Sequence, residues 1–235
     1  MKKVIIDSRA PKAVKATLCD MGFSLIQMPP SPALQTPVSA HPDMLLFIAD
    51  KKVFCHADYQ GIAKAELEEI ADAGYEIITT KENISAEYPH DVLFNALSLN
   101  KHIYGKLDNI SELIKADAEM RGISLHSVKQ GYAKCSVARV GERAAITSDT
   151  TLYKAMIADG YDALLITAGG IGIAEYDTGF IGGCSGCDGE RVYFSGNIDL
   201  HPDAQAIKDF CAKHGMCAVS LSDEPLFDVG SLFFL

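Results

Sequence analysis

The chain ends with the stretch Asp228-Val229-Gly230-Ser231-Leu232-Phe233-Phe234-Leu235. This stretch decides the fold, because it starts a structural unit and leaves it unfinished. The same kind of unit, a short apolar strand that opens at Asp or Cys, starts at four earlier positions, namely Asp43, Asp91, Cys135 and Cys184. Successive opening residues are 44 to 49 positions apart. Only seven residues follow Asp228, so we expect the N-terminal 43 residues to complete the fifth unit.

Each unit continues in the same way after its opening strand. A second short strand is headed by a basic residue, at Lys3, Lys52, His102, Arg143 and Arg191. A helical pattern follows, with apolar residues three and four positions apart, over 11–21, 62–73, 110–121, 150–159 and 202–214. Every helix is followed by Gly and an apolar or aromatic residue, which is typical of a helix C-terminus and a third strand. The unit is therefore predicted to be ββαβ.

Five such units can close into a ring. We predict an α/β fold of one domain, 1–235, with repeats at about 41–88, 89–132, 133–180, 181–225, and 226–235 completed by 1–40. Pairing of the strand within 226–235 with strand 3–7 would remove the open edge of the sheet. A three-layer α/β sandwich is the alternative, but it gives no reason for five matched units.

Composition limits the possible partners. The 235 residues are 48% hydrophobic and carry a net charge of −10, which disfavours nucleic acid and anionic membranes and favours cationic ligands. No segment approaches about 20 apolar residues, and only Val4-Ile5-Ile6 precedes Asp7, so we expect neither a membrane span nor a signal peptide. Seven cysteines, an odd number, indicate reduced thiols and a cytoplasmic protein. Oligomeric state stays open.

No cofactor motif is recognisable. The segment Gly169-Gly170-Ile171-Gly172 lacks the Lys-Ser/Thr pair and the following helix of a phosphate loop. We therefore expect no cofactor.

The opening residues are the best candidates for a functional site. Equivalent positions of a radial repeat converge on the axis, so three carboxylates (Asp43, Asp91, Asp228) and two thiols (Cys135, Cys184) are expected to line one small cavity. Burying ionisable groups without partners is costly, so a cationic ligand, water or a metal is expected between them. Alternatively, they face solvent and pair with the bases that head the second strands.

Two of these residues are candidate nucleophiles. Cys184 lies among Gly182, Gly183 and Gly186, which would let a substrate approach closely. Cys135 follows Lys134, whose side chain we expect to point away from the axis because successive strand residues face opposite sides. A thiol also needs a base or a positive environment.

The nearest base is His41, two residues before Asp43. Alternation along a strand places both on one face, whereas His90 would not share a face with Asp91. Five Asp residues at strand-to-helix junctions are predicted helix caps, namely Asp7, Asp58, Asp108, Asp149 and Asp199.

The pair Cys184 and Cys187 forms a C-x-x-C motif. Zinc would need further ligands, of which Cys135 is one candidate, and a redox motif would open a helix rather than precede the predicted hairpin turn Asp188-Gly189-Glu190. We expect no metal here.

Five ββαβ units with shared termini resemble the pentein fold (α/β-propeller) of guanidino-group modifying enzymes, which include amidinotransferases, deiminases and dimethylarginine hydrolases. The element His41-Pro42-Asp43 is similar to that family's His-x-Asp. The resemblance implies an acid/base role for His41, guanidinium binding by Asp43, Asp91 and Asp228, and a Cys nucleophile. The family carries its nucleophile in the last unit, where this chain has Asp228-Val229-Gly230-Ser231. Cys184, with Cys135 as the alternate, would then act from another unit.

Two hypotheses follow. The chain is either a hydrolase or transferase that acts on a guanidine or another cationic C–N substrate, or a non-catalytic protein that binds a small ligand, a metal or another protein. The second is supported by the resemblance of the same fold to a ribosome anti-association factor, because fold alone does not decide function.

Overall fold

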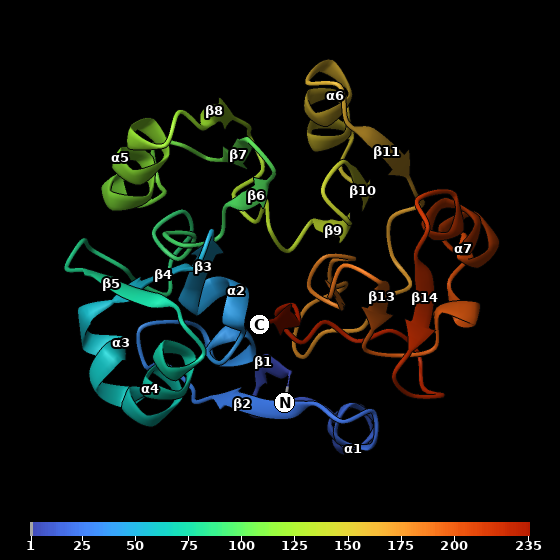
Figure 1. Cartoon of the computed structure of the whole chain (residues 1–235), viewed down its shortest axis with the longest axis horizontal. Helices are drawn as coiled ribbons and strands as arrows, with labels where there is room; N and C mark the ends of the chain where they lie inside the picture. The colour runs from blue at the N-terminus through green and yellow to red at the C-terminus, as the bar shows by residue number, and fades with distance from the viewer. Residues whose placement is uncertain (1) are drawn as a thin grey trace.

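Five three-stranded sheets surround a central axis (Figure 1). The computed structural model describes residues 2–235. We number the sheets as blades 1 to 5. The strands of blades 1 to 3 are β3 (Leu46–Ala49), β4 (Lys52–His56), β5 (Glu76–Thr80), β6 (Leu97–Leu99), β7 (His102–Gly105), β8 (Ser124–Ser127), β9 (Val137–Val140), β10 (Ala144–Thr147) and β11 (Asp162–Leu165). Those of blades 4 and 5 are β12 (Ser185–Cys187), β13 (Arg191–Phe194), β14 (Cys217–Ser220), β15 (Phe233–Phe234), β1 (Lys3–Asp7) and β2 (Ser24–Met28).

The strand order is the same in every blade. The middle strand pairs antiparallel with the inner strand and parallel with the outer strand, which the chain reaches through a helix. Blade 5 combines both ends of the chain, because β15 pairs antiparallel with β1 at Val4↔Phe234 and Ile5↔Phe233. The predicted fold, a five-bladed α/β propeller closed by the N- and C-terminal strands, is therefore confirmed.

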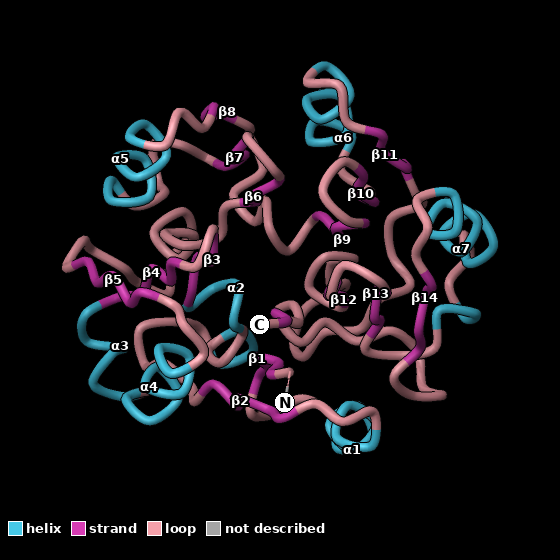
Figure 2. The backbone as a smooth tube through the Cα atoms, viewed as in Figure 1, coloured by secondary structure: helices cyan, strands magenta, loops and turns pink. Residues whose placement is uncertain are grey.

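The longer helices lie at the periphery of the ring (Figures 1 and 2). They are α1 (Lys12–Asp20), α3 (Ala57–Ile62), α4 (Lys64–Asp72), α5 (Glu112–Met120), α6 (Thr150–Ala158) and α7 (Ala204–Lys213). Short helical turns occur at η1 (Thr36–Val38), α2 (Pro42–Leu45) and η2 (Ile198–Leu200). The five helices that periodicity predicts are α1, α4, α5, α6 and α7, each within two residues at both ends, whereas α3 was not predicted.

The core lies between neighbouring blades. One apolar cluster joins Leu97 and Tyr104 of blade 2 to Val137, Leu152 and Met156 of blade 3. Each fully buried large side chain of this kind contributes about 1.5–3 kcal/mol. The blades are thus held by the faces they share rather than by one central core, which leaves the axis for polar groups.

The structure corrects two local expectations. The inner strands start after the opening residues, not at them: Asp43 lies in α2, and Cys135 lies in a turn two residues before β9. Strand alternation therefore does not apply to these positions. Of the five Asp residues predicted to cap helices, Asp149 does so through bonds to the N–H groups of Thr151 and Leu152, whereas α1 has no side-chain cap and Asp7 belongs to the site described below.

Within residues 2–235, no helix combines the length and the apolar character that crossing a lipid bilayer requires. All seven cysteines are free thiols.

Candidate functional site

Four of the predicted site residues lie together at the axis. His41 and Asp43 belong to the start of α2, Cys135 to the turn before β9, and Asp228 to the loop before β15. Their exposed fractions are 4%, 0%, 4% and 1%. The N–H of Asp43 donates to the carbonyl of Gly230 (3.0 Å), which ties α2 to the end of the chain. We call these four residues the axial cluster.

The Asp43 carboxylate is held on one side only. Its Oδ2 accepts a hydrogen bond from the Ser231 hydroxyl (2.6 Å), whose oxygen in turn accepts one from Lys134 Nζ (2.8 Å). Its Oδ1 is buried and has no hydrogen-bond partner among residues 2–235. Leaving a buried carboxylate oxygen unpaired is unfavourable, so Asp43 offers a free acceptor to a ligand.

The Cys135 thiol faces this carboxylate and the side chain of Asn95. Asn95 Nδ2 donates to Cys135 Sγ (2.9 Å), while its Oδ1 accepts from the N–H of Lys134 (2.9 Å). Burial raises the pKa of Cys135 well above its ordinary value of 9.0, the negative charges of Asp43 and Asp228 raise it further, and the bond from Asn95 opposes them. The thiol is therefore protonated in the free protein at neutral pH.

The imidazole of His41 lies between two carboxylates. Its Nε2 is 3.8 Å from Asp7 Oδ2 and its Nδ1 is 3.7 Å from Asp228 Oδ1. Asp7 is also bonded to Arg9 through Nε (3.1 Å) and Nη2 (2.8 Å). The ring therefore has a carboxylate on each side.

Asp228 is fixed by the backbone around it. Its two oxygens accept from the N–H groups of Phe180 and Gly230, both at 2.9 Å. Burial raises the pKa of Asp228, and Asp43 adds to this, whereas His41 and the two N–H groups lower it. A methyl group at Gly183 would stand 2.2 Å from Asp228 Oδ1, so only glycine fits beside this carboxylate.

Asp91 and Cys184 lie outside the axial cluster. Asp91 Oδ2 accepts from the Tyr132 hydroxyl (2.6 Å), its Oδ1 is buried without a hydrogen-bond partner among residues 2–235, and burial raises its pKa. The Cys184 thiol donates to the carbonyl of Ile181 (3.3 Å) in an apolar cluster with Val192, and burial raises its pKa. The structure thus brings three of the five opening side chains together with His41, and places the other two apart.

Sequence reasoning missed Asn95, Ser231 and Lys134. Asn95, Cys135 and Ser231 each stand two residues before their inner strand, so aligning the units on those strands would have placed all three in one column. Lys134 was expected to point outward, but its Nζ reaches Ser231 because the turn reverses the chain there.

The C-x-x-C pair does not form a metal centre with Cys135. Within residues 2–235, these three cysteines do not bring three ligand atoms together. Cys187 Sγ instead lies 3.7 Å from Met216 Sδ.

Two long connections lie beside each other on one side of the axial cluster. Arg9, which holds Asp7, also donates to the carbonyl of Pro37 (3.1 Å) in the segment 29–41. The hydroxyl of Tyr176, in the segment 166–180, donates to Gln35 Oε1 (2.6 Å). The two segments and Arg9 therefore contribute to closing this side.

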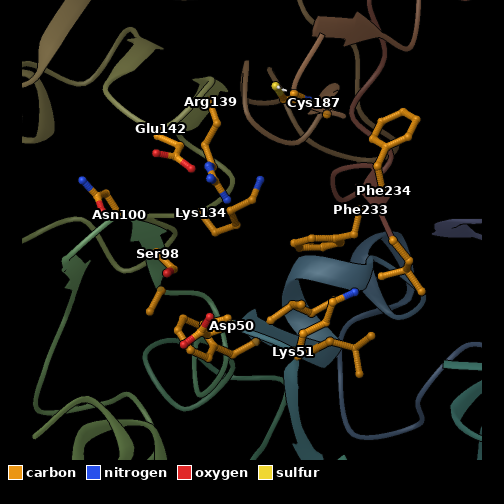
Figure 3. Close-up of a pocket in the computed structure, with 18 of the residues that line it drawn as sticks. Asp50, Lys51, Ser98, Asn100, Lys134, Arg139, Glu142, Cys187, Phe233 and Phe234 are labelled. Atoms are coloured by element: carbon orange, nitrogen blue, oxygen red, sulfur yellow. Dashed lines mark hydrogen bonds between the residues drawn. The ribbon is translucent and has the colours of Figure 1, made fainter. Parts of the chain in front are cut away.

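A cavity of about 900 Å³ opens at the other end of the inner strands (Figure 3). Its wall includes the turns that follow β3, β6, β9 and β12, and it carries the basic residues Lys51, Lys101, Arg121, Lys134 and Arg139. Lys134 and Arg139 extend into the same space in Figure 3. Since Lys134 also bonds Ser231, it separates this basic cavity from the acidic axial cluster.

Solved structures of known enzymes share the fold. The chain superposes on a dimethylarginine dimethylaminohydrolase, solved as an adduct with 4-chloro-2-hydroxymethylpyridine, with a TM-score of 0.58, 13% identity, and coverage of 94% of this chain and 92% of that one. The same kind of enzyme from Pseudomonas aeruginosa, complexed with citrulline, gives a TM-score of 0.57 at 12% identity, with coverage of 97% of this chain and 92% of that one. An amidinotransferase from Microseira wollei in the saxitoxin biosynthetic pathway gives a TM-score of 0.56 at 11% identity, with coverage of 93% of this chain and 88% of that one.

These likenesses establish that the chain has the pentein fold, as the resemblance implied. No curated protein matches the sequence. Residues 5–233, nearly the whole of this chain, match the sequence pattern of one family, and the chain therefore belongs to DUF6873, a family of unknown function.

Proposed function

We propose that this protein is a hydrolase or transferase that breaks a C–N bond of a guanidine or another small cationic substrate. The observation that carries the proposal is the axial cluster, in which a thiol, an imidazole and two carboxylates are buried together. The proposed roles are nucleophile for Cys135, acid/base for His41, and cation binding for Asp43 and Asp228. The dimethylaminohydrolases and the amidinotransferase of the same fold support this substrate class.

Charge favours a cation at this site. The axial cluster has the two carboxylates of Asp43 and Asp228, and Asp43 Oδ1 has no partner among the described residues. A planar guanidinium offers several N–H donors and one positive charge, which would satisfy that oxygen and balance the buried negative charge. Asp91, whose Oδ1 is also unpaired, would bind a second part of the substrate.

The same charges explain how the thiol would be activated. Asp43 and Asp228 hold the pKa of Cys135 high while the site is empty. A bound cation would cancel their effect and lower the pKa of the thiol, so that the thiolate forms only in the complex. Cys135 would lose its proton to His41, Sγ would form a bond to the guanidinium carbon, and the C–N bond would break as His41 gives that proton to the departing amine. Water, or a second amine in a transferase, would lose a proton to His41 as it attacks the same carbon, and the C–S bond would break to release the Cys135 thiolate.

Cys135 is preferred over Cys184 as the nucleophile. Asn95 donates to Cys135 Sγ, an interaction that stabilises a thiolate, whereas the Cys184 thiol is itself the donor to Ile181. Cys184 stays the alternate candidate. In either case the nucleophile would come from blade 3 or blade 4, rather than from the last unit as in the enzymes that the fold resembles.

A substrate would have to enter from the side of the segments 29–41 and 166–180. The cavity at the opposite end carries five basic and two acidic side chains, Asp50 and Glu142, and this positive balance disfavours the approach of a cation. The Gln35–Tyr176 contact joins these two segments, and it would break if they moved apart to admit a substrate.

The test is a screen of arginine, agmatine and methylated arginines for ureido products and released amines. We expect turnover that Cys135→Ser abolishes and that Cys184→Ser largely retains. Labelling provides a second measurement, in which the rate at Cys135 is divided by the rate at the exposed thiols Cys19 and Cys217. This relative rate should be higher with cationic 2-chloroacetamidine than with neutral iodoacetamide. Equal relative labelling by both reagents, together with no turnover, would refute the proposal.

One observation favours a second candidate, a non-catalytic ligand- or protein-binding protein. All four members of the axial cluster are at most 4% exposed, so very little of the thiol is accessible from solvent. This function predicts that Cys135→Ser and Cys184→Ser leave ligand binding unchanged. Turnover in the wild type that is lost in either variant would exclude it.

A further inference from the structure

His102, His126 and Asp159 form a cluster far from the axis, at the border between blades 2 and 3. His126 lies directly opposite Tyr104 in the parallel pair β7–β8, and alternation places His102 on the same face of that sheet. Asp159 ends α6 of the next blade. One ligand atom of each of the three lies within 4.8 Å of the others, and all three side chains are partly exposed. No part of the proposed catalytic function uses them.

The tautomer of His102 can be assigned from its neighbours. The Tyr161 hydroxyl donates its single proton to the carbonyl of Leu99 (2.7 Å), so its oxygen acts as an acceptor toward His102 Nδ1 (2.5 Å). The proton of neutral His102 is therefore on Nδ1 and the lone pair is on Nε2. Fixing one imidazole nitrogen through a hydrogen bond of this kind is what orients a histidine that binds a metal.

His126 faces Asp159 through one ring nitrogen. Its Nδ1 is 3.1 Å from Asp159 Oδ2, a separation that suits two ligands of one ion. An ion bound by both atoms would take the place of the proton that links them, and the ring would carry its proton on Nε2.

The position of Asp159 also indicates a positive charge nearby. It is the C-terminal cap of α6, where the partial negative charge of the helix end disfavours a carboxylate. Its Oδ2 accepts from the Tyr104 hydroxyl (2.7 Å), which holds it toward the two imidazoles. Two imidazoles and an oriented carboxylate are the donors that borderline divalent metals prefer, in contrast to the all-oxygen sites of Mg²⁺ and Ca²⁺.

We propose that His102, His126 and Asp159 form a binding site for a divalent transition metal, with Zn²⁺ as the best match to the donor set. Tyr161 and Tyr104 position the ligands, and solvent completes the coordination. Because two ligands come from blade 2 and one from blade 3, a bound ion would join the outer parts of two blades whose shared core includes Tyr104 and Tyr161. Binding would raise the melting temperature, since the ion binds the folded chain only.

The test is isothermal titration of the metal-free full chain with Zn²⁺, with Co²⁺ as a spectroscopic probe. We expect one site per chain that is lost in His102→Asn and in His126→Asn, with d–d bands typical of nitrogen and oxygen ligands. Tyr161→Phe should weaken binding by about 10- to 100-fold, because it keeps both histidines and removes the hydroxyl that orients His102, along with the bond of that hydroxyl to Leu99. Circular dichroism of each metal-free variant checks that the chain is folded, and Asp159→Asn provides a third variant if one His variant is not.

The chain offers a matched control. His214 Nε2 is 2.8 Å from Asp162 Oδ2, a His–Asp pair without a second histidine, so His214→Asn should leave Zn²⁺ affinity unchanged. Affinity that survives both His102→Asn and His126→Asn in folded protein would overturn the proposal. A thiolate-to-cobalt charge-transfer band would do the same, because it would move the ion to a cysteine.

Discussion

The two ends of the inner strands differ in charge, burial and packing. At the end where the strands begin, Asp43 and Asp228 are 0% and 1% exposed, and one oxygen of Asp43 has no partner among the described residues. At the end where they turn back, basic side chains such as Arg139 line a cavity of about 900 Å³. Lys134 belongs to both ends. The comparison teaches that the acidic end is closed by protein contacts, whereas the basic end is already open.

The largest effect should come from filling the acidic end. In Gly183→Val the new side chain would start 2.2 Å from Asp228 Oδ1 and force apart two segments that bury a carboxylate. We expect a loss of more than about 4 kcal/mol in the free energy of unfolding, or failure to fold, measured by urea denaturation. Gly189→Val is the control for a glycine that has no atom within 4 Å, although its φ of +93° adds strain of its own. Equal loss in the two variants would show that the packing against Asp228 is unimportant.

Removing the amino group of Lys134, which lies between the two ends, should have the next largest effect. Lys134→Met keeps the length of the side chain but removes the donor to Ser231 Oγ, and with it a positive charge that interacts with Asp43. We expect about 1–3 kcal/mol of destabilisation at neutral pH by denaturant titration. Unchanged stability would show that the bond from Lys134 to Ser231 contributes nothing to the free energy of unfolding, as expected of a side chain that lines an open cavity.

The five-unit fold and the four residues of the axial cluster could be predicted from the sequence, because the opening residues recur at regular spacing. Asp43, Cys135 and Asp228 recur with the unit, and His41 stands beside the first of them. Asn95 and Ser231 carry no charge, so a search for ionisable groups passed over them. Lys134 was assigned the wrong direction because a turn was taken for a strand, and Asp7 was taken for a helix cap, since its partner His41 is 34 positions away in the sequence.

A pH measurement can sharpen the comparison at a second acidic group. Burial raises the folded-state pKa of Asp91 above its ordinary value of 3.8, so the folded chain binds the proton more tightly than the unfolded chain. Stability from this group is therefore present at low pH and falls as pH rises from about 3.8 through the raised pKa, by up to about 1.4 kcal/mol per pH unit. Asp91→Asn should flatten that slope in urea denaturation at a series of pH values. A slope that is the same in both proteins would contradict the assignment.

The smallest effect should come from the basic end. The side chain of Arg139 is exposed to the cavity and makes no hydrogen bond or ion pair with any of residues 2–235, whereas its backbone pairs with Ala145 of β10. Arg139→Met should change the free energy of unfolding by no more than about 0.5 kcal/mol, and it is the matched control for Lys134→Met. A loss as large as that of Lys134→Met would remove the distinction between the two ends.

The closure of the ring has a thermodynamic consequence. The loop and strand that pair with β1 also supply Asp228 and Ser231, so a ring that opens at blade 5 loses two of the groups around Asp43. Binding at the axis and closure of the ring are therefore linked equilibria: a ligand held by Asp43 and Asp228 would also oppose fraying of β15 from β1. Hydrogen exchange at the amides of β15 would then report occupancy of a site that no exposed surface reveals.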